Sequence, residues 1–187
     1  MSSARILVID GNVAATRARQ VAALGYDSGQ GYARVLRRLD AALELDVVTT
    51  ADGAVPPASL ESYDGVTMTG SALNIYNGGE PVMRQVELAK AVFQAGVPFF
   101  GSCWGLQVAV TAAGGAVRAN RCGREFGFAR RVLLSEAGRE HALFAGKPVA
   151  FEAPTIHRDA VATLPSGLRT RTACRPPSRT LPVLRTV

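Results

Sequence analysis

Four short apolar runs in the first part of the chain predict β-strands, because strands that are buried on both faces of a sheet are continuously apolar. These runs are residues 4–10, 46–50, 65–69 and 97–102. Residues 32–45 and 80–95 carry apolar side chains at three- and four-residue steps, which predicts amphipathic helices, and residues 105–113 have a helical composition. Strands that alternate with helices indicate crossover connections. We therefore expect an α/β domain with a doubly wound parallel sheet and flanking helices.

Beyond Gly114 and Gly115 the pattern changes to short strands that are separated by turns. The predicted strands are residues 126–135, 149–153 and 161–162, with no long helix between them. We therefore expect a β-rich C-terminal extension within a single domain of residues 1–173. Residues 174–187 contain three prolines and no apolar periodicity, so we expect an irregular, poorly ordered tail and interpret it as a truncated or frameshifted end.

The net charge of +6 is concentrated near the C-terminus, because residues 169–187 hold five arginines and no acidic residue. This segment has no lysine and no aromatic residue, whereas a nucleic-acid surface needs basic side chains gathered on a folded face. We therefore expect no nucleic-acid partner. The chain has no apolar stretch long enough to cross a membrane and no signal-peptide pattern at its N-terminus. These observations predict a cytoplasmic protein without a membrane partner.

Three cysteines, Cys103, Cys122 and Cys174, are an odd number at spacings that resemble neither a disulfide framework nor a metal site. Cys103 differs from the other two because it lies in the sequence Gly101-Ser102-Cys103-Trp104-Gly105, between a predicted strand and a predicted helix. A sharp strand-to-helix turn with glycine two residues before and after a nucleophile is a nucleophile elbow. Unpaired N–H groups at a helix N-terminus favour a thiolate there. We therefore predict that Cys103 is a nucleophile, and we expect neither a metal nor a cofactor.

Residues 101–107 (GSCWGLQ) resemble the nucleophile motif of class I (triad) glutamine amidotransferase domains. Other segments resemble the oxyanion loop of that family, its strand before the cysteine, and later landmarks of its GMP-synthase-like branch. They are residues 68–71 (MTGS), 97–100 (VPFF), 141–144 (HALF), 157–159 (HRD) and 164–167 (LPSG). The resemblance covers about residues 4 to 172 and implies a flavodoxin-like fold. It also implies that a cysteine attacks the side-chain amide of L-glutamine, forms a γ-glutamyl thioester and releases ammonia for a synthetase partner or acceptor.

The resemblance also implies roles for individual residues. Cys103 would be the nucleophile, and the backbone N–H groups of Gly70 and Trp104 would bind the oxyanion of the tetrahedral intermediate. Gln107 would face the substrate glutamine. For Gln107 the alternative interpretation is an amide on the surface of a helix.

The segment His157, Arg158, Asp159 is similar to the family segment whose backbone lies along the α-amino and α-carboxylate groups of glutamine. We therefore expect these residues to contact the substrate, chiefly through the main chain. For Asp159 the alternative interpretation is a carboxylate in a turn.

The sequence departs from the family at the general base. Family members carry a histidine two residues before a glutamate, well downstream of the LPSG turn, whereas the only histidines here are His141 and His157. A thiol that attacks an amide needs a base and then an acid, so we expect impaired glutaminase activity. His157 is an alternative base, although family members carry a histidine there as well; His141 is expected to be structural. Two other functions stay open, a catalytically silent glutamine-binding or interaction module and a DJ-1/PfpI-type cysteine hydrolase.

Overall fold

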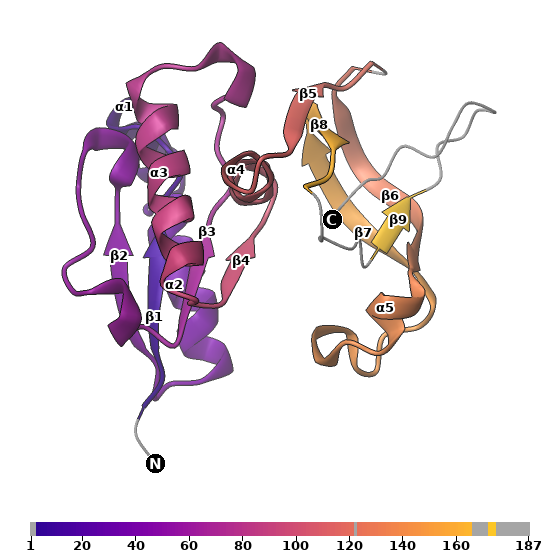
Figure 1. Cartoon of the computed structure of the whole chain (residues 1–187), viewed down its shortest axis with the longest axis horizontal. Coiled ribbons are helices and arrows are strands. Elements are labelled where there is room, and N and C mark those ends of the chain that lie inside the picture. The colour runs from indigo at the N-terminus through magenta and orange to yellow at the C-terminus, as the bar shows by residue number, and fades with distance from the viewer. Residues whose placement is uncertain (1–2, 122, 166–171, 175–187) are drawn as a thin grey trace. The chain divides into compact units, whose positions relative to one another are not determined.

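The computed structural model describes residues 3–121, 123–165 and 172–174, and the chain divides into two compact units, Met1–Ala113 and Gly114–Val187 (Figure 1). The first unit contains a parallel sheet with the strand order β2-β1-β3-β4. Its strands are β1 (Arg5–Ile9), β2 (Glu44–Val48), β3 (Gly65–Met68) and β4 (Phe99–Gly101). The predicted parallel α/β sheet is therefore confirmed. All four carboxyl ends lie at the same edge of this sheet.

The first unit contains four α-helices, of which the first three connect these strands and the fourth follows β4. They are α1 (Ala14–Leu24), α2 (Ser28–Leu39), α3 (Glu80–Gln94) and α4 (Trp104–Ala112), and the short 3₁₀-helices are η1 (Thr50–Asp52), η2 (Leu60–Ser62) and η3 (Ile75–Asn77). Helix α3 crosses in front of the sheet in Figure 1. It packs with α4 in one apolar core that includes Leu7 and Ile9 of β1. Val8 points to the other face and is also fully buried, so both faces of the central strand are covered.

Helix α2 begins earlier than the apolar periodicity predicted, and β2 begins earlier as well. The carboxylate of Asp27 accepts from the Gln30 amide at 2.8 Å, while the Gln30 side chain accepts from the Asp27 amide at 3.2 Å. This capping box fixes the start of α2 at Ser28. Leu45, predicted as the end of the helix, lies in β2 because it pairs with Ile6 of β1.

Helix α1 was missed by the sequence analysis. None of its residues is buried, so its sequence carries little of the amphipathic pattern that reveals a helix. It also lacks a capping side chain at its own N-terminus. Instead, the Asp52 carboxylate in η1 accepts a hydrogen bond from the Ala14 amide at 3.1 Å and pairs with the Arg17 guanidinium. A carboxylate that is distant in sequence therefore caps this helix.

The second unit is rich in β-structure, as expected. Strand β5 (Ala116–Ala119) pairs with β8 (Asp159–Thr163), and a separate antiparallel sheet has the order β7-β6-β9. The strands of this sheet are β6 (Glu125–Leu134), β7 (Ala150–His157) and β9 (Thr172–Cys174), and the short helices are α5 (Glu136–Arg139) and η4 (Ala142–Phe144). Cys174, assigned to the tail by the sequence analysis, is the last residue of β9. Residues 175–187 lie outside the described residues. Within the described part of the chain, no helix is long and apolar enough to cross a membrane.

We expect the Asp52→Asn variant to be about 0.5–1 kcal/mol less stable than the wild type near neutral pH, because a charged cap and an ion pair are lost. Partial burial raises the pKa of the Asp52 carboxyl, but hydrogen bonds from Arg17 and the Ala14 amide outweigh it and lower the pKa below 3.8. A carboxyl whose pKa is lower in the folded state than in the unfolded chain stabilises the fold at pH values above its ordinary pKa. This stabilisation is lost as the pH falls through the lowered pKa.

Urea unfolding of both proteins at about pH 7 and about pH 3 measures this dependence. The stability difference should shrink at the lower pH. Glu87→Gln, which disrupts the exposed pair with Lys90, is the matched control and should change stability by less than about 0.5 kcal/mol. An Asp52→Asn difference that is equal at both pH values would show that the carboxylate charge contributes nothing to the cap.

Candidate active site

Cys103 occupies a sharp turn between β4, which ends at Gly101, and α4, which begins at Trp104. Its backbone angles are φ 53° and ψ −102°, and a positive φ is uncommon for a residue with a side chain. Among the described non-glycine residues only Arg131 shares this feature. Such backbone strain persists where the surroundings impose it, and it concentrates at functional sites. The strand-to-helix elbow predicted from the sequence is therefore present.

The two flanking glycines allow the backbone to pass through this turn. A Cβ atom on Gly101 would lie 2.3 Å from the carbonyl carbon of Gly105. A Cβ atom on Gly105 would lie 2.6 Å from the carbonyl oxygen of Met68, the last residue of β3. Real Cβ contacts are not this short, so both positions require glycine. The Ser102 amide also donates to the Met68 carbonyl at 3.3 Å, which ties the elbow to β3.

Gly70 lies beside Cys103. It follows β3, whereas Cys103 follows β4, and these neighbouring strands pair in parallel. A Cβ atom on Gly70 would be 3.8 Å from the Cβ atom of Cys103, which is an ordinary van der Waals distance. The carboxyl ends of adjacent parallel strands are where doubly wound proteins place ligands. The structure therefore brings Gly70 and Cys103 together at a suitable edge.

The indole of Trp104 has a structural role. It is fully buried, and its Nε1 donates to Oε1 of Gln85 in α3 at 2.8 Å. Gln85 in turn donates to the carbonyls of Gly11 and Pro81 at 3.3 and 3.0 Å. Helix α4 begins at Trp104. The backbone N–H of Trp104 is therefore one of the four at the start of the helix that have no carbonyl acceptor within the helix. Any contact of Trp104 with a substrate is therefore made by this backbone group.

A buried polar cluster that the sequence pattern does not predict follows β1 and β3. The carbonyl of Gly70 accepts from Asn12 Nδ2 at 3.1 Å and from Thr69 Oγ1 at 3.0 Å. Asn12 also donates to the buried carboxylate of Asp10 at 2.9 Å. Gly11 and Asn12 read as an ordinary turn in the sequence. The one sequence signal for this cluster is that Gly11 and Asn12 follow a predicted strand, as Gly70 does. The carboxyl ends of parallel strands lie at the same edge of the sheet.

Gln107 lies in α4, one helical turn after Cys103. The Gln107 amide donates to the Cys103 carbonyl at 3.1 Å, which ties this turn of the helix to the elbow. It is only 7% exposed, and its Oε1 is buried without a hydrogen-bond partner among the described residues. Buried polar atoms are seldom left unsatisfied, so this oxygen can accept a hydrogen bond from a ligand. The alternative of a surface amide on this helix is excluded by its burial.

The remaining predicted site residues lie in the second unit. His157 ends β7, and its Nε2 is 3.3 Å from Oε2 of Glu125, its cross-strand neighbour in β6. The other ring nitrogen, Nδ1, is buried without a partner among the described residues. The carbonyl of Arg158 accepts from the Asn120 amide at 2.9 Å, and Asp159 is buried at the start of β8. The predicted site residues thus form one group in each unit.

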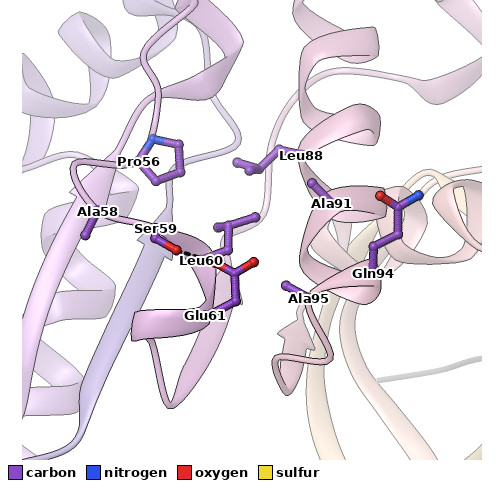
Figure 2. A pocket seen from close by; sticks show the side chains of 9 residues that line it. All are labelled: Pro56, Ala58, Ser59, Leu60, Glu61, Leu88, Ala91, Gln94 and Ala95. Carbon is purple, nitrogen blue, oxygen red and sulfur yellow. Dashed lines mark hydrogen bonds between the residues drawn. The ribbon is translucent and has the colours of Figure 1, made fainter.

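A cavity of about 500 Å³ opens on the first unit between the loop that contains η2 and the second half of α3 (Figure 2). It is lined by Pro56, Ala58, Ser59, Leu60, Glu61, Leu88, Ala91, Gln94 and Ala95. Because η2 precedes β3 and the end of α3 precedes β4, this cavity lies at the amino ends of the strands. It contains none of the predicted site residues. Across the described ranges, no cluster of side chains is arranged to hold a metal ion.

Comparison with known proteins identifies the family. The family model of class I glutamine amidotransferases matches residues 26–178. This match spans most of the chain, which therefore belongs to that family. The structure is similar to a glutamine amidotransferase from Thermotoga maritima, with a TM-score of 0.73 and 20% identity over 93% of this chain and 68% of that one. At this identity the likeness shows the fold.

Two relatives in sequence illustrate the range of the family. A gamma-glutamyl-L-1-hydroxyisopropylamide hydrolase from a Pseudomonas species is 35% identical over 171 residues, which are 89% of this chain and 58% of the relative. A glutamine-hydrolysing GMP synthase from Streptomyces coelicolor is 29% identical over 142 residues, which are 75% of this chain and 25% of that protein. The chain thus spans little more than half the length of the first relative and a quarter of the second.

We predict that Cys103 is the most reactive of the three cysteines, because it is half-buried in an elbow at the N-terminus of a helix. Limiting iodoacetamide followed by peptide mapping measures the labelling of each cysteine. Cys103 should be alkylated first. Preferential labelling of Cys122 or Cys174 would contradict the nucleophile assignment.

Proposed function

We propose that this chain hydrolyses L-glutamine to glutamate and ammonia through a thioester on Cys103. The sulfur attacks the side-chain amide carbon, the C–N bond breaks, and ammonia leaves after it takes up a proton. Water then attacks the γ-glutamyl thioester and releases glutamate and the thiol. The observation that carries the proposal is the strained elbow of Cys103 beside Gly70 in a chain of the amidotransferase family.

Two backbone N–H groups are proposed to stabilise the tetrahedral intermediate. Gly70 supplies one from the loop after β3, and Trp104 supplies the other from the first turn of α4. The positive end of the α4 dipole adds to both, since negative charge develops next to a helix N-terminus. Loss of one such donor typically slows acyl transfer about 10²–10³-fold.

Gln107 is proposed to contact the substrate. The unpartnered Oε1 of Gln107 is suited to accept from the substrate, and its position one turn after Cys103 supports this role. The main chain of His157, Arg158 and Asp159 is proposed to bind the α-amino and α-carboxylate groups, as the family resemblance implies. The ammonia product is proposed to pass to a synthetase partner, as the similarity to GMP synthases suggests.

The general base limits the proposed reaction. His141 Nδ1 accepts from the Leu143 amide at 3.3 Å in a turn, which supports a structural role. His157 is paired with Glu125, and the sequence contains no further histidine. Loss of a general acid–base group typically costs about 10²–10⁴-fold in rate. We therefore propose that the chain turns over glutamine slowly. If no turnover remains, the chain is a glutamine-binding module without catalytic activity. Membership of the amidotransferase family favours either of these functions over a DJ-1/PfpI-type hydrolase.

A second substrate class is supported by one observation. The relative that is 35% identical over 89% of this chain is a hydrolase of an N-substituted γ-glutamyl amide. The same thioester would form from such a substrate, and the leaving group would be an amine instead of ammonia. Competition between L-glutamine and gamma-glutamyl-L-1-hydroxyisopropylamide for the purified chain would separate the two classes.

We expect the purified 187-residue chain to release ammonia from L-glutamine at about 10⁻³–10⁻¹ s⁻¹, which is a typical enzyme rate reduced by the missing base. A coupled assay measures ammonia and glutamate together. Cys103→Ala should abolish the release. His157→Ala should leave the residual rate within about threefold, as should the matched control His141→Ala.

Two results would overturn parts of this proposal. An undiminished rate in Cys103→Ala would exclude the thioester mechanism. A wild-type rate in the ordinary range of about 1–10³ s⁻¹ that is lost in His157→Ala but kept in His141→Ala would show that His157 is the base and that activity is not impaired.

A further inference from the structure

We propose that Asn12 is a positioning residue, which holds the Gly70 backbone at the distance from the Trp104 N–H that an oxyanion requires. This inference rests on the function proposed above and adds to it a component outside the catalytic motif. Asn12 lies three residues after the end of β1, whereas Gly70 and Cys103 follow β3 and β4. Its role follows from two buried contacts of the Gly11-Asn12 segment, one between Asn12 and the Gly70 carbonyl and one between Gly11 and Gln85.

The Asn12 amide has a fixed orientation. It is 2% exposed, and its Nδ2 lies 2.9 Å from Asp10 Oδ1, 3.1 Å from the Gly70 carbonyl and 3.3 Å from Ser28 Oγ. A carboxylate and a carbonyl only accept, so the NH₂ group must face both of them. Asp10 is itself fixed, because its carboxylate also accepts from the Asn12 and Gly29 amides at 2.9 and 2.7 Å.

The Gly70 carbonyl therefore meets a rigid donor. Its second donor, Thr69 Oγ1, is fully buried and accepts from the Gly11 amide at 3.0 Å. A glycine has more backbone freedom than any other residue, and its position would otherwise be poorly defined. The two donors hold the peptide after Gly70, and the Thr69 amide donates to the Ile9 carbonyl at 3.0 Å. Gly70, whose N–H is the predicted oxyanion donor, is therefore held on both sides.

The same segment is tied to the second donor. The Gly11 carbonyl accepts from Gln85, and Gln85 accepts from the Trp104 indole. Gly11 can approach the indole this closely because it has no side chain: a Cβ atom there would lie 2.5 Å from Trp104 Cδ1. Gly11 and Asn12 thus connect the residues that carry both oxyanion donors. Donors that are arranged before the reaction cost no reorganisation during it.

Two alkylating reagents separate this role from general support of the fold. The chloroketone 6-chloro-5-oxo-L-norleucine carries its ketone carbon where glutamine carries the amide carbon. Attack of Cys103 on this ketone forms a tetrahedral oxyanion before the C–S bond replaces the C–Cl bond and chloride leaves. Iodoacetamide reacts by direct displacement of iodide and forms no such oxyanion. Only the chloroketone reaction depends on the position of Gly70.

We expect Asn12→Ala to slow chloroketone labelling of Cys103 about 10–100-fold, less than the loss of a whole donor, while iodoacetamide labelling changes less than about twofold. Thr69→Val, which conserves shape, should act in the same direction and provides a second variant if Asn12→Ala does not fold. Ser28→Ala removes another contact of Asn12 without touching Gly70, and this matched control should label like the wild type. Melting temperatures report folding of each variant.

The outcomes are distinguishable. Equal rates in all variants, or equal slowing with both reagents, would overturn the positioning role and leave the proposed function intact. Wild-type Cys103 that is not labelled by the chloroketone, or that is labelled equally fast in excess L-glutamine, would overturn the proposed function and this inference with it. Selective slowing in Asn12→Ala and Thr69→Val supports both.

Discussion

Among the glycines of the first unit, Gly101 has the least room for a side chain, because it lies against the Gly105 peptide. A single methyl group at Gly101 would overlap that peptide, since its Cβ would lie 2.3 Å from the carbonyl carbon. The end of β4 packs against the first turn of α4, so the chain must reverse direction within the two residues between them, Ser102 and Cys103. Cys103 takes the positive φ that this turn requires, and the surrounding sheet and helix maintain the strain.

The elbow depends in turn on buried polar groups. Asp10, Thr69 and Gln85 are fully buried, and all three hydrogen-bond to neighbouring loops or helices at the carboxyl edge of the sheet. Burial of such groups is costly unless each is paired, so a network that is fully satisfied specifies one arrangement. The apolar core could be formed by many sequences. The polar network fixes the position of the Gly70 loop relative to helix α4, which begins at Trp104.

Local signals in the sequence were sufficient for most strands and for the elbow. Apolar runs marked β1 and β3, and the glycines around Cys103 marked a strand-to-helix turn. Helix α1 was missed because it buries no residue and is capped by Asp52, a contact that no local pattern reveals.

The support of the site was missed for a related reason. Gln85 and Gly11 are 74 positions apart in the sequence, and they meet only because α3 packs on the sheet. The pair of His157 with Glu125 likewise depends on the register of β6 and β7. Composition and periodicity describe only local sequence, so they cannot predict which distant residues meet. These contacts form only in the folded chain.

The central claim is that the elbow presents Cys103 to a γ-glutamyl carbonyl. Acid-quenched reactions with γ-glutamyl-p-nitroanilide, whose leaving group needs little acid assistance, test it by mass spectrometry of the intact chain and its peptides. The control is Gly31→Ala in α2, where an added Cβ atom would meet only the Tyr26 side chain. The account predicts a γ-glutamyl adduct on Cys103 in the wild type and in this control, and no adduct in Cys103→Ala or Gly101→Ala. A wild-type chain without the adduct, or a folded Gly101→Ala variant that forms it equally well, would contradict the account.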